Sequence, residues 1–535
     1  MIQTHSLTFL DLAVVCLYIG GLIAVGVLDR RRARRARDHF LAASSASWPK
    51  IGFALYASTI SATSLVGLTG SAYAHGISVF AYEWMAAFVL PVFCAFVLPT
   101  YVKSQIFTVP EFLELRYGRF VRTYVSGLSV ALGTFLDASG GLFAGSVLFQ
   151  MLFPDWPLWE VSTGLALLAG AFLLAGGLRA VILIESIQGL ILVASCAAIA
   201  FFSFRAVGSG SVGGGWHQVM THLDPSKLKL IMGAGDKSLP WTGLLTGVPL
   251  VGFYFWCTNQ NMVQRVLAAR SLDDGRWGSL LGGAMKLTNL FLVILPGAAA
   301  LLLFPGLKQP DQVFAHIVFG LLPPGLTGLI LAACLISILS GLSAIYNSTS
   351  TLLTMDFVRR FRPDMNDQAL ILTGRVLIVV LMVISILWVP QIVRFQDTLW
   401  QYLQSVLCYF VPPIAAVFLT GLFVRRVNNA GAGWGLAIGT GASFVLFFGV
   451  EVFHVIPLHF LVAAMVIFLI SLAAIACGTF SAPAPDVARI APLMFSKAVW
   501  HAETVHLKAA KPWQNYRYLS LGLMALTVVI VVWFW

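Results

Sequence analysis

Charged residues are scarce in this 535-residue chain. Asp, Glu, Lys and Arg together make up 10% of it, whereas they make up about a quarter of an ordinary soluble domain. Hydrophobic residues make up 59%. This shortage of charge excludes a soluble globular protein, and the sequence predicts an all-α integral membrane protein in contact with the lipid bilayer.

Catalytic and metal-binding patterns are also missing. The seven cysteines fall within apolar segments, without the spacing of metal ligands or of a disulfide framework. The chain has no HExxH, no GxSxG and no phosphate-binding loop, so we expect neither an enzyme nor an organic cofactor. The net charge is +11, but the basic residues gather in short loops between apolar runs. That pattern is typical of cytoplasmic loops and argues against a nucleic-acid partner.

About twenty apolar residues are needed for each membrane-spanning helix, and the sequence predicts about fourteen such helices. The first is expected to be an uncleaved span rather than a signal peptide, because an arginine run follows it and no basic segment precedes it. The predicted spans are approximately 8–28, 49–70, 78–100, 120–152, 158–176, 178–205, 239–261, 277–304, 324–355, 369–389, 397–423, 430–450, 456–477 and 516–535.

Alternate loops carry most of the arginine, beginning with Arg30 to Arg37 after the first span. Since basic loops stay in the cytoplasm, this alternation predicts a multi-pass protein of the cell membrane with both termini outside the cytoplasm. The longest inner segment, 478–515, is predicted either as an interfacial helix or as a solvated connector.

One predicted span is unusually rich in hydroxyl groups. Residues 57–71 contain seven Ser or Thr residues, and Gly67 and Gly70 interrupt the helical pattern. A second span, TGVPLVGFYFWCTNQ, is weakened in its middle by Gly247, Pro249 and Gly252. Discontinuous helices in matching positions are the signature of inverted-repeat transporters, and broken backbone at membrane depth indicates an ion or substrate site.

Charged side chains inside spans cost about 3 kcal/mol on insertion scales, so they usually face a cavity or a partner. Here they are Glu83, Asp137, Glu185 and Lys286. Glu83 and Lys286 are predicted either to bind substrate hydroxyls or to form a buried ion pair that fixes helix packing. Asp137 and Glu185 are predicted to bind a cation, to relay a proton or to cap polar backbone.

Hydroxyl and aromatic side chains add two weaker indications. Ser337, Ser340 and Ser343 share a helix face, which suits sodium if they meet a broken helix and suits close helix packing otherwise. Aromatic residues with a few polar groups suit a sugar ring, and such a set is formed by Tyr254, Phe255, Trp256 and Gln404. Ordinary bundle packing explains the aromatics equally well.

Several long motifs resemble the sodium:solute symporter family, and most of all its sodium/glucose cotransporter branch. The motifs are ASTISATSLVGLTGSAYAHG with AYEW, TVPEFLELRYG, GGLRAVILIESIQG, WTGLLTGVPLVGFYFWCTNQNMVQRVLAA, LPG at 295–297 and NSTSTLLTMD. The resemblance implies a LeuT-type core of two inverted five-helix repeats. Residues 49–235 and 236–427 would form the repeats, with extra helices in 1–48 and 428–535.

The resemblance also implies a sodium site. Its ligands would be backbone oxygens of Ala57 and Ile60 in the broken helix, together with the Ser337 backbone oxygen and the Ser340 hydroxyl. The family places a second hydroxyl residue directly after that serine, whereas this chain has Gly341. The family's intramembrane carboxylate corresponds to Glu185, which keeps a second cation or proton role open, with Asp137 as the other candidate.

For the substrate, the resemblance assigns hydrogen bonds to Glu83, Lys286 and Gln404. Trp256 and Phe255 would lie at the inner gate, and Ser64 and Thr59 would face the substrate. The outer gate would be Leu68, Tyr82 and Trp400. The expected function is symport of a sugar or polyol with a cation, sodium by resemblance. The alternatives are a proton-coupled or uncoupled sugar transporter of the same fold and a sugar sensor without transport.

Overall fold

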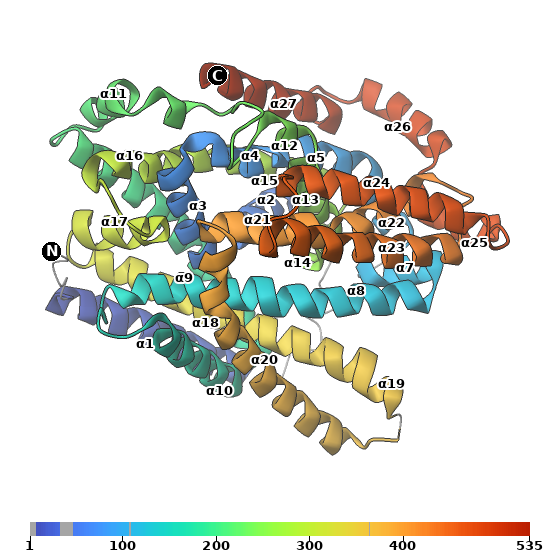
Figure 1. The fold of residues 1–535 in the computed structure, drawn as a ribbon, viewed down its shortest axis with the longest axis horizontal. Coiled ribbons are helices and arrows are strands. Elements are labelled where there is room, and N and C mark those ends of the chain that lie inside the picture. The colour runs from blue at the N-terminus through green and yellow to red at the C-terminus, as the bar shows by residue number, and fades with distance from the viewer. Residues whose placement is uncertain (1–6, 33–45, 106–108, 363) are drawn as a thin grey trace.

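Helices make up the described architecture. The computed structural model describes residues 7–32, 46–105, 109–362 and 364–535, with the backbone alone at 22–32, 174–187 and 506. Across these ranges it contains no strand, only two isolated bridges, Ala46 with Ala269 and Met232 with Pro240. The all-helical class predicted from composition is confirmed (Figure 1).

The first half of the chain forms α1 (Phe9–Arg32), α2 (Trp48–Thr59), α3 (Ala62–His75), η2 (Ile77–Phe80), α4 (Ala81–Trp84), α5 (Ala86–Val92), η3 (Phe93–Val97), α6 (Leu98–Lys103), α7 (Val109–Tyr117), α8 (Arg119–Leu132), η4 (Gly133–Ala138), α9 (Ser139–Gln150), α10 (Leu158–Val207), α11 (Val212–His222), η5 (Pro225–Leu228), α12 (Trp241–Leu245), α13 (Gly247–Phe253), η6 (Tyr254–Thr258) and α14 (Gln260–Leu267).

The second half forms α15 (Leu272–Leu287), η7 (Leu290–Ile294), α16 (Leu295–Leu303), η8 (Pro310–Gln312), α17 (Val313–Leu321), α18 (Leu326–Leu352), η9 (Leu353–Val358), α19 (Arg359–Phe361), α20 (Asp367–Phe395), α21 (Leu399–Phe410), α22 (Pro412–Phe423), α23 (Asn429–Phe447), η10 (Phe448–Val452), α24 (Phe460–Thr479), α25 (Val487–Ile490), η11 (Ala491–Leu493), α26 (Lys497–Ala509) and α27 (Tyr516–Trp533). Of the η elements, η3, η4, η6, η7, η9 and η10 are π-helical and continue a longer helix.

Many of these helices are suited to a bilayer. Within the described residues, nine helical stretches are long and apolar enough to cross a membrane, or up to eleven when each of two bent helix pairs counts as one span. The parts of α1 and α10 whose side chains are described add two shorter apolar stretches, Phe9–Gly21 and Leu158–Leu173. The chain is a multi-pass membrane protein, and the count of fourteen spans stays a prediction.

One expected loop is absent. The spans predicted at 158–176 and 178–205 are joined in a single 50-residue helix, α10. Gly176 and Gly177 lie at the boundary between the two predicted spans. Glycine weakens a helix by about 1 kcal/mol per residue but keeps its backbone N–H, so it does not force a turn as proline does.

The two bent pairs place sharp turns inside predicted spans. α2 and α3 meet at 64°, so this span is discontinuous as predicted. The break lies at Ile60 and Ser61, whereas Gly67 and Gly70, which were expected to interrupt the helix, lie inside α3. α21 and α22 meet at 52°, whereas 397–423 was expected to be a single uninterrupted span. Pro412 and Pro413 open α22, and two consecutive prolines cannot donate the backbone hydrogen bonds that would continue α21.

The second predicted break lies at different residues from those expected. α13 runs unbroken through Pro249 and Gly252, and the interruptions come before it at Thr246 and after η6 at Asn259. Pro249 is the third residue of α13. Because the first four N–H groups of a helix have no partner within it, proline at this position costs no hydrogen bond.

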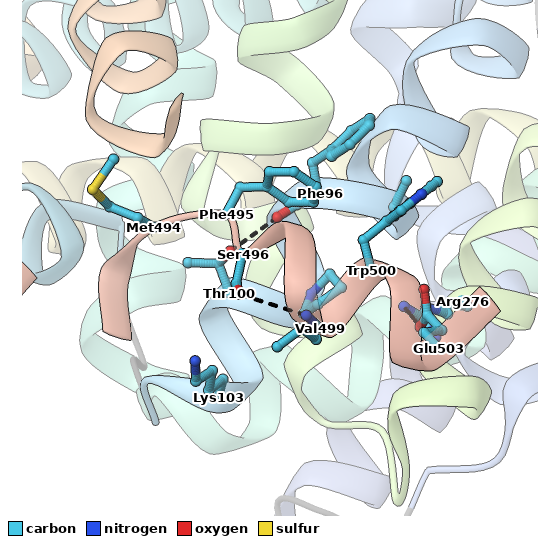
Figure 2. Close-up of a pocket in the computed structure, with 12 residues that line it drawn as sticks. Phe96, Thr100, Lys103, Arg276, Met494, Phe495, Ser496, Val499, Trp500 and Glu503 are labelled. Atoms are coloured by element: carbon cyan, nitrogen blue, oxygen red, sulfur yellow. Dashed lines mark hydrogen bonds and ion pairs between the residues drawn. The ribbon is translucent and has the colours of Figure 1, made fainter. Parts of the chain in front are cut away.

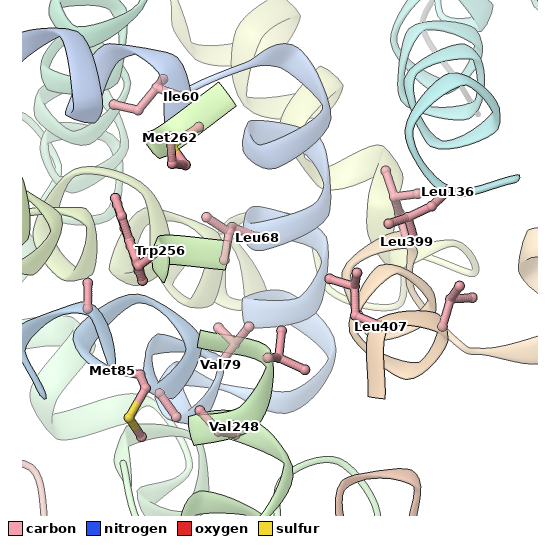
Figure 3. Packing of buried hydrophobic residues seen from close by; sticks show 14 of the residues in the cluster. Ile60, Leu68, Val79, Met85, Leu136, Val248, Trp256, Met262, Leu399 and Leu407 are labelled. Atoms are coloured by element: carbon pink, nitrogen blue, oxygen red, sulfur yellow. The ribbon is translucent and has the colours of Figure 1, made fainter. Parts of the chain in front are cut away.

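One connected set of buried apolar side chains runs through the bundle. Figure 3 shows part of it, with Ile60, Leu68 and Trp256 around the broken helix and Leu136, Leu399 and Leu407 on elements across from it. α26 is a helix, and its Leu507 joins this core. The interfacial-helix interpretation of 478–515 therefore fits this segment better than a solvated connector does.

Candidate functional site

Serine hydroxyls build the break between α2 and α3. The Ser61 N–H donates to Ser64 Oγ at 2.9 Å, and the Ser64 N–H donates to Ser61 Oγ at 3.2 Å. This reciprocal capping satisfies two N–H groups that a helix start leaves free. Ser58 and Thr59 donate to the carbonyls of Leu55 and Tyr56. In this structure, the hydroxyls of Thr59 and Ser64 therefore bond to the protein's own backbone.

Of the predicted sodium ligands, two lie at the end of α2. The Ala57 carbonyl accepts the Ile60 N–H at 3.2 Å, and Ile60 is 4% exposed. α2 packs on α10 here, because a methyl group at Gly189 would lie 2.6 Å from the Ala57 Cβ.

The other two predicted sodium ligands lie on α18. Ser340 is buried, and its hydroxyl donates to the Ser337 carbonyl at 3.3 Å. α18 packs against α10 and touches α3, so both pairs lie on helices that share α10 as a neighbour. A methyl group at Gly341 would meet no described atom within 4 Å, apart from its own helix backbone and chain neighbours.

Glu83 and Lys286 form a buried ion pair. Lys286 Nζ lies 2.6 Å from Glu83 Oε2, and both side chains are at most 5% exposed. This confirms the pairing anticipated from one cation among three carboxylates. α4 and α15, which carry the pair, are thereby joined across 203 residues of sequence.

Two neutral residues that the sequence reasoning missed extend this pair. Asn289 donates to the same Glu83 oxygen at 2.5 Å and accepts from the Tyr56 hydroxyl at 2.8 Å. The Tyr56 hydroxyl also lies 3.0 Å from Thr288 Oγ1. A continuous polar chain therefore runs from Lys286 through Glu83 to the broken helix α2. The signal that could have found Asn289 is its position as a buried amide in an apolar run.

Two of the three residues predicted to form the outer gate are in contact, and the third is buried. The rings of Tyr82 and Trp400 meet edge to face with centroids 6.3 Å apart, and Leu68 is 2% exposed. Trp400 lies against Gly67, whose added methyl group would be 3.4 Å from its ring and its backbone N. On the predicted gate and substrate residues, three buried polar atoms lack a hydrogen-bond partner among the described residues. They are Tyr82 Oη, Trp400 Nε1 and Gln404 Oε1.

The aromatic pair after the second break is also in place. Trp256 is 4% exposed and its ring meets Phe255 at 5.1 Å between centroids. Both residues belong to the π-helical turn η6, and π-helical turns frequently mark functional sites. Figure 3 shows Trp256 beside the broken helix.

Asp137 and Glu185 are the two remaining predicted site carboxylates, and the structure describes the side chain of Asp137 only. Asp137 lies in the π-helical turn η4, is exposed although Leu136 and Ala138 are buried, and interacts electrostatically with Tyr254 of η6. Glu185 lies on α10, and its side chain is outside the described residues. No group of three or more His, Cys, Asp or Glu among the described residues is arranged to hold a metal ion.

A separate hollow lies where α26 crosses the bundle (Figure 2). It is lined by Phe96, Lys103, Arg276, Phe495, Trp500 and Glu503, among others. Glu503 holds two arginines, with Arg276 Nη2 at 2.5 Å and Arg517 Nη2 at 3.0 Å. The Arg517 guanidinium also stacks on Trp500 at 3.7 Å. The hollow is therefore part of the attachment of α26 and lies apart from the polar chain at Glu83.

Known proteins with similar sequences are cotransporters. Human sodium/glucose cotransporter 4 is 34% identical over 81% of this chain and 68% of its own length. The sodium/mannose cotransporter of Bos taurus is 32% identical over 91% and 89%. Sodium/myo-inositol cotransporter 2 of Oryctolagus cuniculus is 32% identical over 81% and 69%.

Solved structures agree on the fold. A Na+-coupled sialic acid symporter, solved in a substrate-bound outward-open state, superposes with a TM-score of 0.70 at 20% identity, covering 89% of this chain and 99% of its own. The nucleobase-cation-symport-1 family transporter Mhp1 in a closed conformation gives a TM-score of 0.51 at 14% identity, covering 84% and 97%. The sodium:solute symporter family model matches residues 39–439. This chain belongs to the sodium:solute symporter family.

Proposed function

We propose that the chain is a secondary active transporter that moves a sugar or polyol together with sodium by alternating access. The observation that carries this is the polar chain from Lys286 through Glu83 and Asn289 to Tyr56. It joins a buried charge pair directly to the broken helix, where discontinuous backbone can bind ions or substrate. Occupancy of one site can thereby bias the arrangement of the other.

A hydroxylated substrate fits the groups near the predicted gate. The unpartnered atoms of Tyr82, Trp400 and Gln404 include two donors and one acceptor, and a sugar hydroxyl can serve as both. Trp256 offers an aromatic ring to the apolar face of a sugar. The relatives that carry glucose, mannose and myo-inositol support this substrate class.

Sodium would be held by the carbonyls of Ala57, Ile60 and Ser337 and by the Ser340 hydroxyl. In the same proposal, residues 49–235 and 236–427 form the inverted repeats of a fourteen-span protein, with both termini outside the cytoplasm. Proton coupling is the second candidate. It is favoured by the exposed carboxylate of Asp137 within a span and by the missing hydroxyl at Gly341.

The test is uptake of a panel of labelled sugars and polyols into proteoliposomes with a sodium gradient, a proton gradient or no gradient. Sodium-driven accumulation supports the proposal. Accumulation that follows the pH gradient, ignores sodium and is lost in Asp137→Asn or Glu185→Gln supports proton coupling. Binding without counterflow exchange would show a sensor and contradict transport.

A further inference from the structure

Asp311 is a buried acidic residue that the proposed transport mechanism does not use. It lies in η8, in the connection between α16 and α17, outside the membrane-spanning stretches, and is 3% exposed. Its Oδ2 accepts the backbone N–H of Leu399 at 2.8 Å. Its Oδ1 is buried and has no hydrogen-bond partner among the described residues.

The glycine face of α3 receives both Asp311 and Trp400. A methyl group at Gly70 would overlap Asp311 Oδ1 and lie 2.8 Å from its Cα. Gly67, three residues earlier and on the same helix face, is a looser neighbour of Trp400, because a methyl group there would lie 3.4 Å from the Trp400 ring and backbone N. The connection that carries Asp311 and the gate residue Trp400 are therefore seated side by side on one helix.

Asp311 also holds the start of α21. That helix begins at Leu399. At its N-terminus, Thr398 Oγ1 accepts the Gln401 N–H, and Asp311 Oδ2 accepts the Leu399 N–H. A carboxylate at a helix N-terminus is favoured by the helix dipole. α21 carries Trp400 of the predicted gate and Gln404 of the predicted substrate site. A residue 88 positions away in sequence thus fixes the end of the helix that bears both.

We propose that Asp311 is a positioning residue for the predicted outer gate: Asp311 docks residues 304–325 onto α3 and α21, and it takes up a proton when the gate closes. The gate itself rests on the proposed alternating access. The docking and its proton uptake stand on the contacts above and do not depend on which solute is carried.

The direction of the pH effect follows from burial. In the docked structure, burial raises the pKa of Asp311 to about 7, against the lowering effect of the Leu399 N–H. An undocked, solvated aspartate has a pKa of about 3.9. Between pH 7 and 4 the docked form therefore binds a proton that the undocked form does not, so acidification favours docking by about tenfold per pH unit. Above pH 7 the effect disappears.

Other groups near Asp311 titrate in the same range. η8 packs against α3, α9 and α17. α3 carries His75, α17 carries His316, and Asp397 precedes α21, whereas α9 has no residue that titrates between pH 4 and 8. A test must therefore separate Asp311 from these two histidines and from Asp397.

The experiment measures the distance between spin labels on Lys308→Cys, in the docking connection, and Arg394→Cys, just before α21. Both positions are exposed. The exposed Cys16 and Cys477 are replaced by serine. The protein is reconstituted without substrate at pH 8.5, 7 and 5.5. We expect a single docked distance to gain population on acidification, with an equilibrium constant about 30-fold larger at pH 5.5 than at pH 8.5, and about 15-fold larger than at pH 7.

Three variants decide the assignment. Asp311→Asn keeps an oxygen for the Leu399 N–H, and we expect it to give the acid-form distance at every pH. Asp311→Ala loses the acceptor and is expected to give the undocked distance at every pH. Asp397→Asn should respond to pH as the parent does. A pH response that persists in Asp311→Asn, or a docked distance in Asp311→Ala, would overturn the proposal. Thermal unfolding confirms that each variant is folded. Failure of sugar uptake alone leaves these distances unchanged and counts only against the proposed function.

Discussion

At Glu83, one carboxylate oxygen accepts from Lys286 and from Asn289 in a fully buried setting. Removing one member of a buried ion pair leaves an uncompensated charge, which typically costs about 3–5 kcal/mol. We therefore expect Glu83→Ala to lower the unfolding temperature sharply, and Glu83→Ala with Lys286→Met to recover much of the loss. Thermal unfolding in detergent checks this.

Gln404→Ala is the matched comparison. Gln404 is also buried, but its Oε1 has no partner among the described residues, so its removal strands no charge. We expect substrate affinity to fall by about tenfold, or roughly 1.4 kcal/mol, with little change in the unfolding temperature. Equal destabilisation by Gln404→Ala and Glu83→Ala would contradict a ligand role for Gln404.

Gly341 offers a gain-of-function test. Because a methyl group there would meet no described atom within 4 Å beyond its own helix backbone and chain neighbours, Gly341→Ser should fold with a stability change below about 1 kcal/mol. If the Ser340 region binds sodium, we expect sodium to be bound more tightly, as measured by titrating uptake or thermal stability with NaCl. Gly328→Ser is the steric control on α18, because a methyl there would lie 2.6 Å from the Asp11 Cα. Unchanged sodium dependence in Gly341→Ser would count against this sodium site.

Charged site residues were easier to predict than neutral ones. Glu83 and Lys286 could be paired from sequence, because charges inside spans are rare and costly. Asn289 and Tyr56 were missed because neutral polar residues in a span satisfy themselves in many ways. Asp311 was missed because acidic residues in loops are usually solvated, and only the tertiary contact with Gly70 and Leu399 reveals its burial.

At the scale of the element, the α2–α3 break depends on the Ser61–Ser64 pair. Ser64→Ala removes the oxygen that accepts the Ser61 N–H and the hydroxyl that donates to the Ser61 carbonyl at 2.9 Å. We expect a loss of about 1 kcal/mol, the usual cost of a lost cap, and weaker sodium dependence because the neighbouring Ile60 carbonyl is no longer held. Chemical unfolding and sodium titration measure the two effects.

Ser58→Ala is the control for that element. Ser58 donates to the Leu55 carbonyl within the helix, and such a bond adds little to helix stability. We therefore expect Ser58→Ala to leave the stability and the sodium dependence almost unchanged. If the two serine variants behave alike, the capping pair does not set the break.

The presence of broken helices could be predicted from the sequence, but the residues at which each break lies could not all be predicted. The first follows from local chemistry, since Ser61 and Ser64, which cap the new helix, are close in sequence, whereas Gly67 and Gly70 lie inside α3 and do not interrupt it. The second was misplaced because Pro249 lies in the first turn of a new helix rather than inside an old one. That distinction depends on the conformation of Thr246, which composition does not specify.

At the scale of the whole molecule, Glu503 joins α26 to α15 and α27 through Arg276 and Arg517. We expect Glu503→Gln to weaken this attachment by about 1–3 kcal/mol, in the range for a hydrogen bond to a charged group. Hydrogen exchange of 497–509 should rise, while exchange in α3 and α21 stays unchanged. Lys508→Ala, an exposed change on the same helix, is the control. Faster exchange in both variants would indicate general fraying of α26.

The Glu83–Lys286 pair has a consequence for how the chain is made. Glu83 enters the membrane 203 residues before its partner. At about 5–20 residues per second, the ribosome takes roughly 10–40 s to reach Lys286. During that interval the early helices carry the Glu83 carboxylate without its partner, Lys286. Until the second half of the chain supplies Lys286, we expect the Glu83 carboxyl to be protonated or hydrated.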